Sequence, residues 1–342
     1  MIRDGKENIL NLELNELEEL VTSLGEKKFR AKQIFLWLSK LVGSFDEMNN
    51  LPAELRKLLD ERFYIALPEV VVKQESKTDS TIKCLYEFSD GARVESVFMK
   101  YDYGNSICIS SQVGCKMGCK FCASTIDGLD RSLTAGEMLA EVYKMCSITS
   151  EKISHIVVMG MGEPFDNYDE LSKFIRLIHN SDGYGLSLRN ITVSTCGIIP
   201  LIKRFQEEFP QVNLAISLHA PNQEIRNKIM PVSNKFGYDE LLKACKEYTE
   251  ITKRRITFEY SMIDGVNDSI QNATELANKL AGWLTHVNLI PLNVVKERNF
   301  NTAKKSNIEN FRKALEEHGV AVTVRRTLGA DIDAACGQLR QR

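Results

Sequence analysis

The chain has 342 residues, of which 43% are hydrophobic and 26% are charged, so it can bury a substantial core in one large or two unequal domains. This composition excludes a disordered chain. The 44 lysines and arginines stand against 46 aspartates and glutamates, which gives a formal net charge of -2. A polybasic protein is thereby excluded, and any nucleic acid must be bound by a local basic patch.

The sequence shows no sign of membrane insertion or export. No apolar run approaches the roughly 20 residues that span a bilayer, and acidic residues interrupt the N-terminal stretch where a signal peptide would have its apolar core. We therefore expect a cytoplasmic protein that does not bind a membrane. We also expect it to act as a monomer.

Residues 1–65 have the apolar periodicity of helices. One apolar stripe covers Leu17–Leu24, a second covers Ala31–Leu38, and a third helix follows Pro52. The second helix is basic, and its helical angles place its tryptophan away from the apolar stripe. Such a ring could stack on a base, or it could pack on a neighbouring helix beneath a solvated basic face. The candidate RNA-binding residues are Lys28, Arg30, Lys32 and Trp37.

Residues 66–100 are predicted to form a β-hairpin that links this helical module to the rest of the chain. Two strand-like runs flank Asp90 and Gly91, a dipeptide typical of tight hairpin turns. By its residues alone, Glu95 in the second run is expected to be solvated. Cys108 follows in Ser106–Ser110, where the alternation of apolar and polar residues predicts another strand.

Three of the nine cysteines lie close together in a glycine-containing segment, which predicts a loop. Cys115, Cys119 and Cys122 have three and then two residues between them. A zinc site would need a fourth ligand, and none of the five histidines has the usual spacing for one. An iron–sulfur cube held by three thiolates keeps one iron free to bind a small molecule. Three thiols that cluster by chance are the remaining alternative.

After the cysteines, short apolar runs alternate with helical stretches, which predicts parallel βα units. The predicted strands cover 153–159, 191–194, 212–218, 255–262, 286–290 and 320–325. The predicted helices cover 135–146, 241–251 and 308–317, the last with Ser306 as its N-cap and Gly319 at its end. The predicted fold class is α/β: a partial (β/α)6 barrel over residues 101–330, with the helical accessory domain before it.

Polar or glycine-rich residues follow several of these strands, at the end where α/β barrels carry their working groups. The segment Gly160–Pro164 combines glycines, which allow close backbone approach, with a carboxylate. Ser194, Ser217, His219 and Asn293 follow other strands. Each alone could be a loop cap or a satisfied core group, but their recurrence at successive strand ends favours a ligand site.

The cysteine spacing, with Phe121 before the last cysteine, resembles the signature of the radical SAM superfamily. The resemblance implies a [4Fe-4S] cluster bound by the three cysteines, with S-adenosylmethionine on the open iron and a 5'-deoxyadenosyl radical as the product of its cleavage. By the same resemblance, the S-adenosylmethionine contacts are Gly162, Glu163, Ser194, Ser217, Leu218, His219 and Asn293.

The tail, residues 331–342, carries Cys336 beside a glycine. Together with the cysteine spacing and Gly160–Pro164, it resembles the RlmN/Cfr family of RNA methyltransferases over nearly the whole chain. The resemblance implies that Cys336 carries the methyl group as S-methylcysteine, that Cys108 is the resolving thiol and that Glu95 is the proton acceptor. It also implies that the N-terminal module binds RNA. The remaining cysteines are expected to be core or surface thiols: Cys84, Cys146, Cys196 and Cys245.

The implied reaction is methylation of C2 of adenosine in 23S rRNA and tRNA, with two S-adenosylmethionine molecules, a transient covalent RNA adduct and an electron donor such as flavodoxin or ferredoxin. C2 is an electron-poor ring carbon, so it cannot attack a methyl group as an amine would, whereas a thiolate can accept the methyl group. Two alternatives remain. One is the Cfr type of enzyme, which methylates C8 and confers ribosomal antibiotic resistance; Pro164 favours C2. The other is a non-catalytic iron–sulfur RNA-binding protein, which would not need Cys108 and Cys336.

Overall fold

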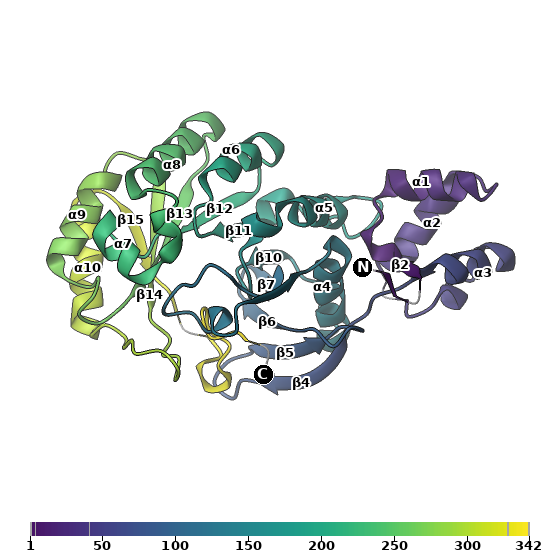
Figure 1. Cartoon of the computed structure of the whole chain (residues 1–342), viewed down its shortest axis with the longest axis horizontal. Helices are drawn as coiled ribbons and strands as arrows, with labels where there is room; N and C mark the ends of the chain where they lie inside the picture. Colours follow the sequence, from purple (N-terminus) through teal and green to yellow (C-terminus); the bar gives the residue numbers. More distant parts are fainter. Residues whose placement is uncertain (1, 4, 41, 327, 341–342) are drawn as a thin grey trace.

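The computed structural model describes residues 2–3, 5–40, 42–326 and 328–340. Its main element is a sheet of ten strands (Figure 1). In chain order these strands are β4 (Glu69–Glu75), β5 (Ile82–Glu87), β6 (Arg93–Tyr101), β7 (Gly104–Ile109), β10 (His155–Val158), β11 (Ile191–Thr195), β12 (Asn213–Ser217), β13 (Ile256–Met262), β14 (Thr285–Pro291) and β15 (Ala321–Val324).

The strands from β7 to β15 are parallel and follow one another in chain order across the sheet. The α/β fold class and all six predicted strands are confirmed, and β7, which carries Cys108, is a seventh parallel strand beside β10. The predicted hairpin forms β5 and β6. Because β6 pairs with β7 in antiparallel fashion, the hairpin extends the barrel sheet and covers one edge of it.

Seven helices of the described chain follow the parallel strands. They are α4 (Ala135–Thr149), α5 (Tyr168–His179), α6 (Ile199–Glu208), α7 (Gln223–Ile229), α8 (Tyr238–Thr252), α9 (Ile270–Leu280) and α10 (Lys305–Glu317). The predicted helices correspond to α4, α8 and α10. The N-cap predicted for α10 is wrong. The helix begins at Lys305, before Ser306, and its N-cap is Lys304, which has an extended backbone. A tertiary contact holds this start, because Asn307 in the first turn donates to Asp268 (2.7 Å).

The N-terminal module contains the three predicted helices and a small sheet, and it sits at one end of the molecule beside α4 and α5 (Figure 1). Its elements are β1 (Ile2–Arg3), β2 (Lys6–Asn8), α1 (Leu14–Ser23), α2 (Phe29–Leu38), α3 (Ala53–Arg62) and β3 (Phe63–Tyr64). The contact with α4 is close: the backbone N–H of Gly136 donates to Asn11 (2.8 Å), and a Cβ on Gly136 would lie 2.7 Å from the Asn11 side-chain oxygen. Only glycine fits at this position.

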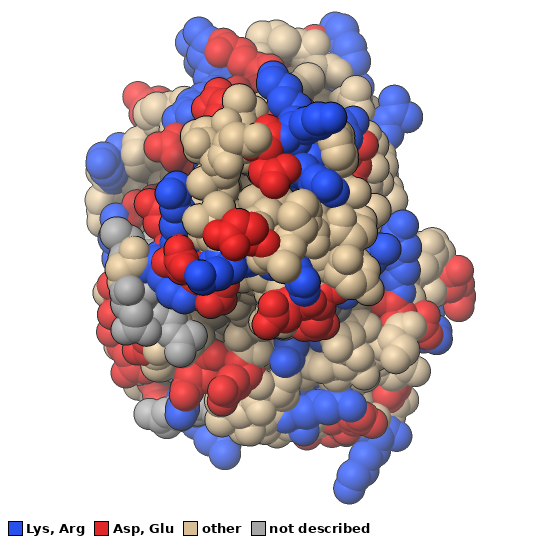
Figure 2. All heavy atoms as spheres, turned by 90° about the vertical axis from the view of Figure 1, so that its right-hand side faces the viewer, with Lys and Arg blue, Asp and Glu red and all other residues tan. Residues whose placement is uncertain are grey.

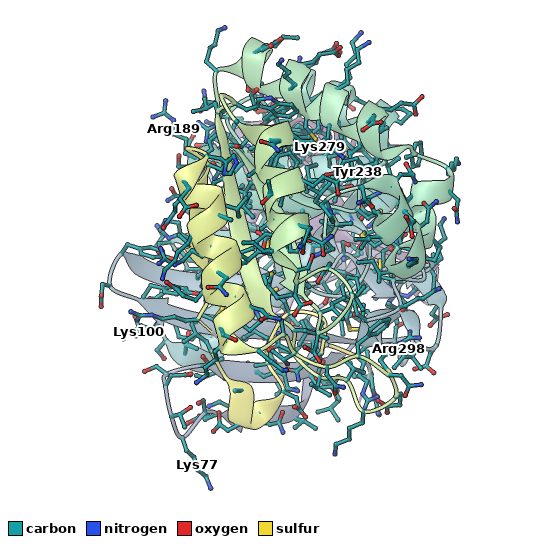
Figure 3. The ribbon with its side chains drawn as sticks, turned by 90° about the vertical axis from the view of Figure 1, so that its left-hand side faces the viewer. Lys77, Lys100, Arg189, Tyr238, Lys279 and Arg298 are labelled. Carbon is teal, nitrogen blue, oxygen red and sulfur yellow. The ribbon has the colours of Figure 1, made fainter. Side chains whose placement is uncertain are left out.

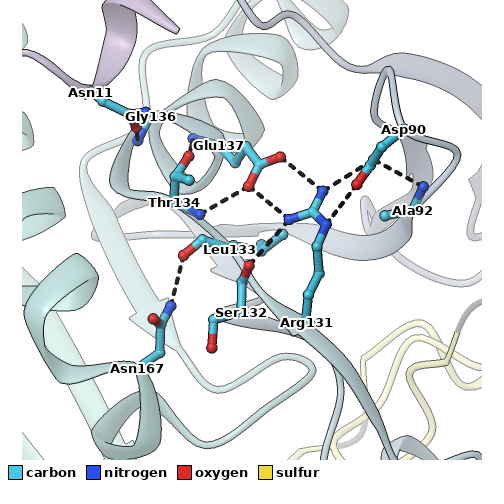
Figure 4. Close-up of polar contacts among 10 residues, drawn as sticks. All are labelled: Asn11, Asp90, Ala92, Arg131, Ser132, Leu133, Thr134, Gly136, Glu137 and Asn167. Carbon is cyan, nitrogen blue, oxygen red and sulfur yellow. Dashed lines mark hydrogen bonds and ion pairs between the residues drawn. The ribbon is translucent and has the colours of Figure 1, made fainter. Parts of the chain in front are cut away.

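Arg131 joins the hairpin to the barrel (Figure 4). It lies on β9 (Leu129–Ser132), which pairs with β8 (Gln112–Gly114). Its guanidinium donates to both carboxylate oxygens of Asp90 in the hairpin turn (2.7 and 3.1 Å) and to both of Glu137 at the start of α4 (2.9 Å each). Two bidentate contacts on one planar cation fix the turn against the helix.

A carboxyl group lies in the core beneath the sheet. Glu141 of α4 is fully buried, accepts hydrogen bonds from the Ser96 hydroxyl and from the Ser110 N–H (3.1 Å), and its Oε1 has no partner among the described residues. Burial raises the pKa of this carboxyl to about 8, although the two hydrogen bonds lower it in part. Glu141 is therefore mostly protonated at neutral pH.

None of the helices in the described ranges has the length and apolar character needed to cross a membrane.

We predict that Glu141→Gln makes the protein less sensitive to alkaline pH. The folded carboxyl keeps its proton up to about pH 8, whereas the unfolded one loses it near 4.5. The group's contribution to the free energy of unfolding therefore falls by about 1.4 kcal/mol per pH unit across that window. Thermal melts between these pH values should show the wild type losing stability relative to the variant as pH rises. Glu317→Gln, an exposed position on α10, is the control, and parallel curves for Glu141→Gln and wild type would contradict the prediction.

Candidate functional site

The carboxyl ends of the parallel strands, the cysteine loop and the tail surround a cavity. Most of the residues singled out in the sequence meet here. The cavity is lined by Cys115, Cys119, Cys122, Gly162, Glu163, Ser194, Ser217, His219, Asn293 and Cys336. Leu218 does not line it; its side chain packs in the hydrophobic core.

The cysteine loop is held through its backbone. The Thr125 hydroxyl donates to the carbonyls of Cys119 (2.9 Å) and Cys122 (3.1 Å). Arg298, labelled in Figure 3 on the segment after β14, donates to the Cys122 carbonyl (3.2 Å) and to Thr125 (2.8 Å). These contacts fix the loop without using the three thiols, which face the cavity.

The donor set of the loop fits an iron–sulfur cluster better than a zinc ion. Among the described residues, no three His, Cys, Asp or Glu side chains are arranged around a single metal position, as a zinc site requires. A cubane gives each thiolate its own iron, so three cysteines spread along one loop can hold it. Burial raises the pKa of all three thiols, that of Cys115 to about 12, so their ionisation depends on the positive charge of the bound irons.

The glycines after β10 allow two chain segments to touch. A Cβ on Gly160 would lie 2.7 Å from the carbonyl oxygen of Ile109 at the end of β7. Gly162 has φ +101°, and its Cβ would lie 2.6 Å from that of Gln112, three residues before Cys115. The glycines thereby bring the end of β10 against the segment that leads into the cysteine loop.

Glu163 is a fixed carboxylate in the cavity wall. It is buried and accepts hydrogen bonds from the N–H groups of Cys196 (2.7 Å) and Phe165 (3.0 Å). Burial raises its pKa, and these N–H donors oppose that shift. Cys196, expected to be a core or surface thiol, is buried in a small hydrophobic cluster and also lines the cavity beside this carboxylate.

His219 is a neutral side chain with one defined donor. Its Nδ1 accepts a hydrogen bond from the Ser261 N–H (2.9 Å), so the ring proton sits on Nε2. Burial, and secondarily the nearby Arg226, lower its pKa to about 3. The ring packs edge-on against Phe121 with centroids 5.0 Å apart. Nε2–H is therefore the donor that His219 can offer to a ligand.

Arg226 links the carboxyl ends of β11 and β12 by hydrogen bonds. The side chain is fully buried and donates to the carbonyls of Cys196 (2.6 Å), Ser217 (3.2 Å) and Leu218 (3.2 Å). On this rim the hydroxyl oxygens of Ser194 and Ser217 lie 3.4 Å apart. The two serines therefore face the same part of the cavity.

The tail forms one wall of the cavity. Asn293 donates to the Cys336 carbonyl (3.1 Å), and the Ser124 hydroxyl, just after the cluster cysteines, donates to the Leu339 carbonyl (2.7 Å). On the other side of Cys336, Asp331 accepts hydrogen bonds from the turn between β4 and β5. Hydrogen bonds therefore hold the tail on both sides of Cys336. Residues 341 and 342 of the predicted tail lie outside the described residues.

Cys336 and Cys108 share a second cavity of about 510 Å³ with Arg325, which lines both cavities. Burial raises the pKa of the Cys108 thiol, as does the nearby Cys336, whereas the Arg325 guanidinium lowers it. The structure thus brings the two predicted reactive thiols together beside one cation.

Glu95 is not solvated, contrary to expectation. Its side chain is 2% exposed, pairs with Lys83 (3.1 Å) and accepts a hydrogen bond from the Arg340 N–H (2.7 Å), because β6 lies inside the sheet and the tail covers this face. Burial raises its pKa, although Lys83 opposes the shift. Glu95 lies on the same sheet face as Cys108, since its near neighbour Val97 is the register partner of Cys108, but it lines neither of the two cavities.

The four candidate RNA-binding residues lie far along the chain from this site, on the N-terminal module, and each has a partner in the protein. Lys28 lies 3.8 Å from Glu18, Arg30 donates to Gln33 and the Asn50 carbonyl, Lys32 pairs with Asp182 at 3.0 Å, and the Trp37 indole donates to Asn50 at 2.6 Å. Figure 2 shows acidic and basic side chains interspersed over this end of the molecule.

Two further cavity residues escaped the sequence reasoning: Glu259 and Arg325. Glu259 is the one charged residue of strand β13, and it is buried and hydrogen-bonded to Asn288 (2.9 Å). That interruption is a signal which could have identified it. Arg325 directly follows the last strand, where the strand-end rule also applies.

Two family models match the chain. Residues 7–65 match the N-terminal domain of ribosomal RNA large subunit methyltransferases, and residues 109–277 match the radical SAM superfamily. Among solved structures, a radical SAM methyltransferase from Sphaerobacter thermophilus has a TM-score of 0.94 at 43% sequence identity, over 98% of this chain and 100% of that one.

Relatives with the same name match along nearly their whole length. The protein called "probable dual-specificity RNA methyltransferase RlmN" in Clostridium novyi is 51% identical over 98% of both chains. Its namesake in Lachnoclostridium phytofermentans is 52% identical over 98% of this chain and 95% of its own. With the fold, the cysteine loop and the tail in the same chain, these matches show that the protein belongs to the RlmN family of radical SAM methyltransferases.

Proposed function

We propose that the protein methylates C2 of adenosine in 23S rRNA and tRNA, as a monomer, through a methyl group carried on Cys336. The observation that carries this proposal is the position of Cys336 on the wall of the cavity that also holds the three cluster cysteines, with Cys108 beside it in the second cavity. The names of the relatives support RNA as the substrate.

The family's cofactors, a [4Fe-4S] cluster and S-adenosylmethionine, supply the one-electron cleavage that generates a 5'-deoxyadenosyl radical. Cys115, Cys119 and Cys122 would hold the cluster. Glu163 and the backbone at Gly162 would receive the ammonium group of S-adenosylmethionine. Ser194, Ser217, His219 and Asn293 would orient the rest of the molecule from the strand ends, with Leu218 acting through its backbone. The tail closes the cavity on one side, which keeps water from a reactive radical.

Cys336 would first take a methyl group from one S-adenosylmethionine as a thiolate nucleophile. Loss of a hydrogen atom from that S-methyl group to the 5'-deoxyadenosyl radical would leave a methylene radical, which can add to the electron-poor C2 and tether the RNA to the protein. One electron would then have to leave the adduct radical, and the oxidised cluster would be its acceptor. Glu95 would accept the C2 proton, and the Cys108 thiolate would attack the Cys336 sulfur. The carbon–sulfur bond to the base would break as the disulfide forms, and the carbon would take up a proton to become the methyl group. The shared cavity of the two thiols supports the disulfide step.

The first prediction of this proposal concerns the product. Reconstituted enzyme incubated with 23S rRNA, S-adenosylmethionine and a reductant should yield 2-methyladenosine by nucleoside mass spectrometry. Cys119→Ala should form no 5'-deoxyadenosine, whereas Cys146→Ala, which alters a thiol on α4 outside both cavities, should retain activity. A methyl group at C8 would reject the C2 assignment, and 5'-deoxyadenosine from Cys119→Ala would reject the cluster ligands.

The second prediction separates the two thiols. Cys336→Ala should be inactive and form no RNA adduct, because no methylene radical can exist without that sulfur. Cys108→Ala should stall with RNA covalently attached to Cys336, because release through a disulfide is lost. Denaturing gels would show the stalled species as a slowly migrating band. Identical behaviour of the two variants, or an adduct in Cys336→Ala, would show that the roles are assigned wrongly.

The third prediction concerns the RNA contacts proposed for the N-terminal module. Lys28, with a side chain that is 73% exposed, should contact phosphate, as should Arg30 and Lys32, while Trp37 borders the same face. Lys28→Ala should weaken rRNA binding and lower the slope of log affinity against log salt by about one, with cluster content unchanged. Lys313→Ala, on the exposed face of α10, is the control. An unchanged salt slope for Lys28→Ala would remove Lys28 from the RNA-binding surface.

A further inference from the structure

A buried ion pair lies beside the tail, at the residue proposed above as the proton acceptor. The Lys83 ammonium lies 3.1 Å from Oε1 of Glu95, and the two side chains are 10% and 2% exposed. Taking two charges out of water often costs more than burying apolar side chains of the same size. Lys83 takes part in none of the steps above. The pair is therefore poorly explained by stability alone.

The register of the sheet brings the two residues together. Strand β5 pairs with β6 so that Leu85 lies opposite Glu95 and Lys83 lies opposite Val97. Lys83 is thus the diagonal neighbour of Glu95 on the same sheet face, within reach of a long side chain. Val97 is in turn the register partner of Cys108 on β7. One face of three neighbouring strands therefore carries Lys83, Glu95 and Cys108.

Two donors hold the Glu95 carboxylate, and they come from different parts of the chain. Oε1 faces Lys83 of the sheet, and Oε2 accepts a hydrogen bond from the backbone N–H of Arg340 in the tail (2.7 Å). Lys83 also donates to the carbonyl of Asp333 in the tail (3.4 Å). Donors of this kind favour the ionised form of the carboxylate.

The tail separates Glu95 from the main cavity. Cys336 and Leu339 line that cavity. Arg340 lines a different space, together with Glu95 and Lys83. For an adduct on Cys336 to reach Glu95, the tail has to shift, and the shift removes the donor that the tail supplies. The donor on the sheet is then the one that holds the carboxylate.

The other charged groups at this space leave Lys83 as the cation of Glu95. The charged residues that line the space are Lys83, Glu95, Lys296, Glu297, Asp333 and Arg340. The Arg340 guanidinium pairs with Glu297 (2.5 Å). Within the described ranges, neither Lys296 nor Asp333 forms an ion pair. Lys83 is therefore the cation in contact with the Glu95 side chain.

The charge of Lys83 acts against the effect of burial on Glu95. Burial raises the pKa of this carboxyl, and the largest opposing influence is Lys83. Without that charge the carboxyl would keep its proton to higher pH. A protonated carboxyl cannot accept a second proton from C2.

We propose that Lys83 is a positioning residue for the methylation, which keeps Glu95 ionised and oriented until it takes the proton from the RNA adduct. The inference rests on the proposed function, because only that reaction gives Glu95 a proton to accept. In this step the C2 carbon–hydrogen bond breaks, its electron pair stays in the base, and the proton goes to a Glu95 oxygen. The ion pair with Lys83 is lost at the same moment.

The test follows the RNA adduct through one turnover of the holoenzyme on denaturing gels, over a range of pH. Lys83→Met should form the adduct like wild type, but the adduct should decay about 10-fold more slowly at pH 7, because each unit by which the pKa of Glu95 rises above the working pH removes a factor of ten of the carboxylate. The acidic limb of decay rate against pH should move to higher pH. Lys83→Arg, which keeps the charge, should restore most of the rate.

Two further variants separate this role from a structural one. Lys296→Met removes a cation from the same space and should decay like wild type. In a Glu95→Gln protein, which lacks the acceptor, adding Lys83→Met should slow adduct decay no further. Formation of 5'-deoxyadenosine verifies that each variant is folded and loaded with its cluster. If Lys83→Met loses the cluster, Lys83→Gln, which keeps a donor for the Asp333 carbonyl, replaces it.

Wild-type decay with an unshifted pH profile in the Lys83 variant would overturn the proposal, even if the variant melts at a lower temperature. Further slowing in the double variant would overturn it as well, since Lys83 would then act without Glu95. A failure of the proposed function looks different. Either no RNA adduct would appear in any of the proteins, wild type included, or Glu95→Gln alone would decay as fast as wild type, which would reject Glu95 as the acceptor.

Discussion

The buried guanidinium of Arg226 is the constraint on which the geometry of the cavity depends. A charge removed from water costs several kcal/mol unless dipoles replace the lost hydration, and here backbone carbonyls at the ends of β11 and β12 replace it. These carbonyls can accept hydrogen bonds from the guanidinium only if both strands end at this point. The positions of Ser217 and His219 on the rim follow from that requirement. Cys119 is close enough for the same positive charge to oppose the rise in its thiol pKa that burial causes.

Local sequence patterns were sufficient to predict the strands and the cysteine loop. The βα alternation located β10 to β15 within a few residues, because each buried parallel strand is a short apolar run that needs no knowledge of its neighbours. Three cysteines within eight residues must lie on one loop whatever the fold. The strand-end rule then brought Ser194, Ser217 and Asn293 to the cavity, since all parallel strands end on the same side.

The misplaced residues depend on contacts between distant parts of the chain. The burial of Glu95 requires both the pairing of β6 with β7 and the arrival of the tail about 240 residues later, and no local pattern contains either. The ion pair of Lys32 likewise depends on a distant segment, because its partner Asp182 belongs to the barrel. Ser306 has the residue type of an N-cap, whereas the start of α10 is held by a tertiary contact.

Hydrogen bonds hold the tail on both sides of Cys336, so its sulfur stays beside the cavity. Because Cys336 and Cys108 line one small space, each thiol meets the other at the effective concentration of an intramolecular reaction, which exceeds that of any thiol in solution. Proximity of this kind favours a disulfide between them whenever an oxidant removes the electrons. A protein with two thiols in one cavity therefore needs a cell that keeps returning both to the reduced state.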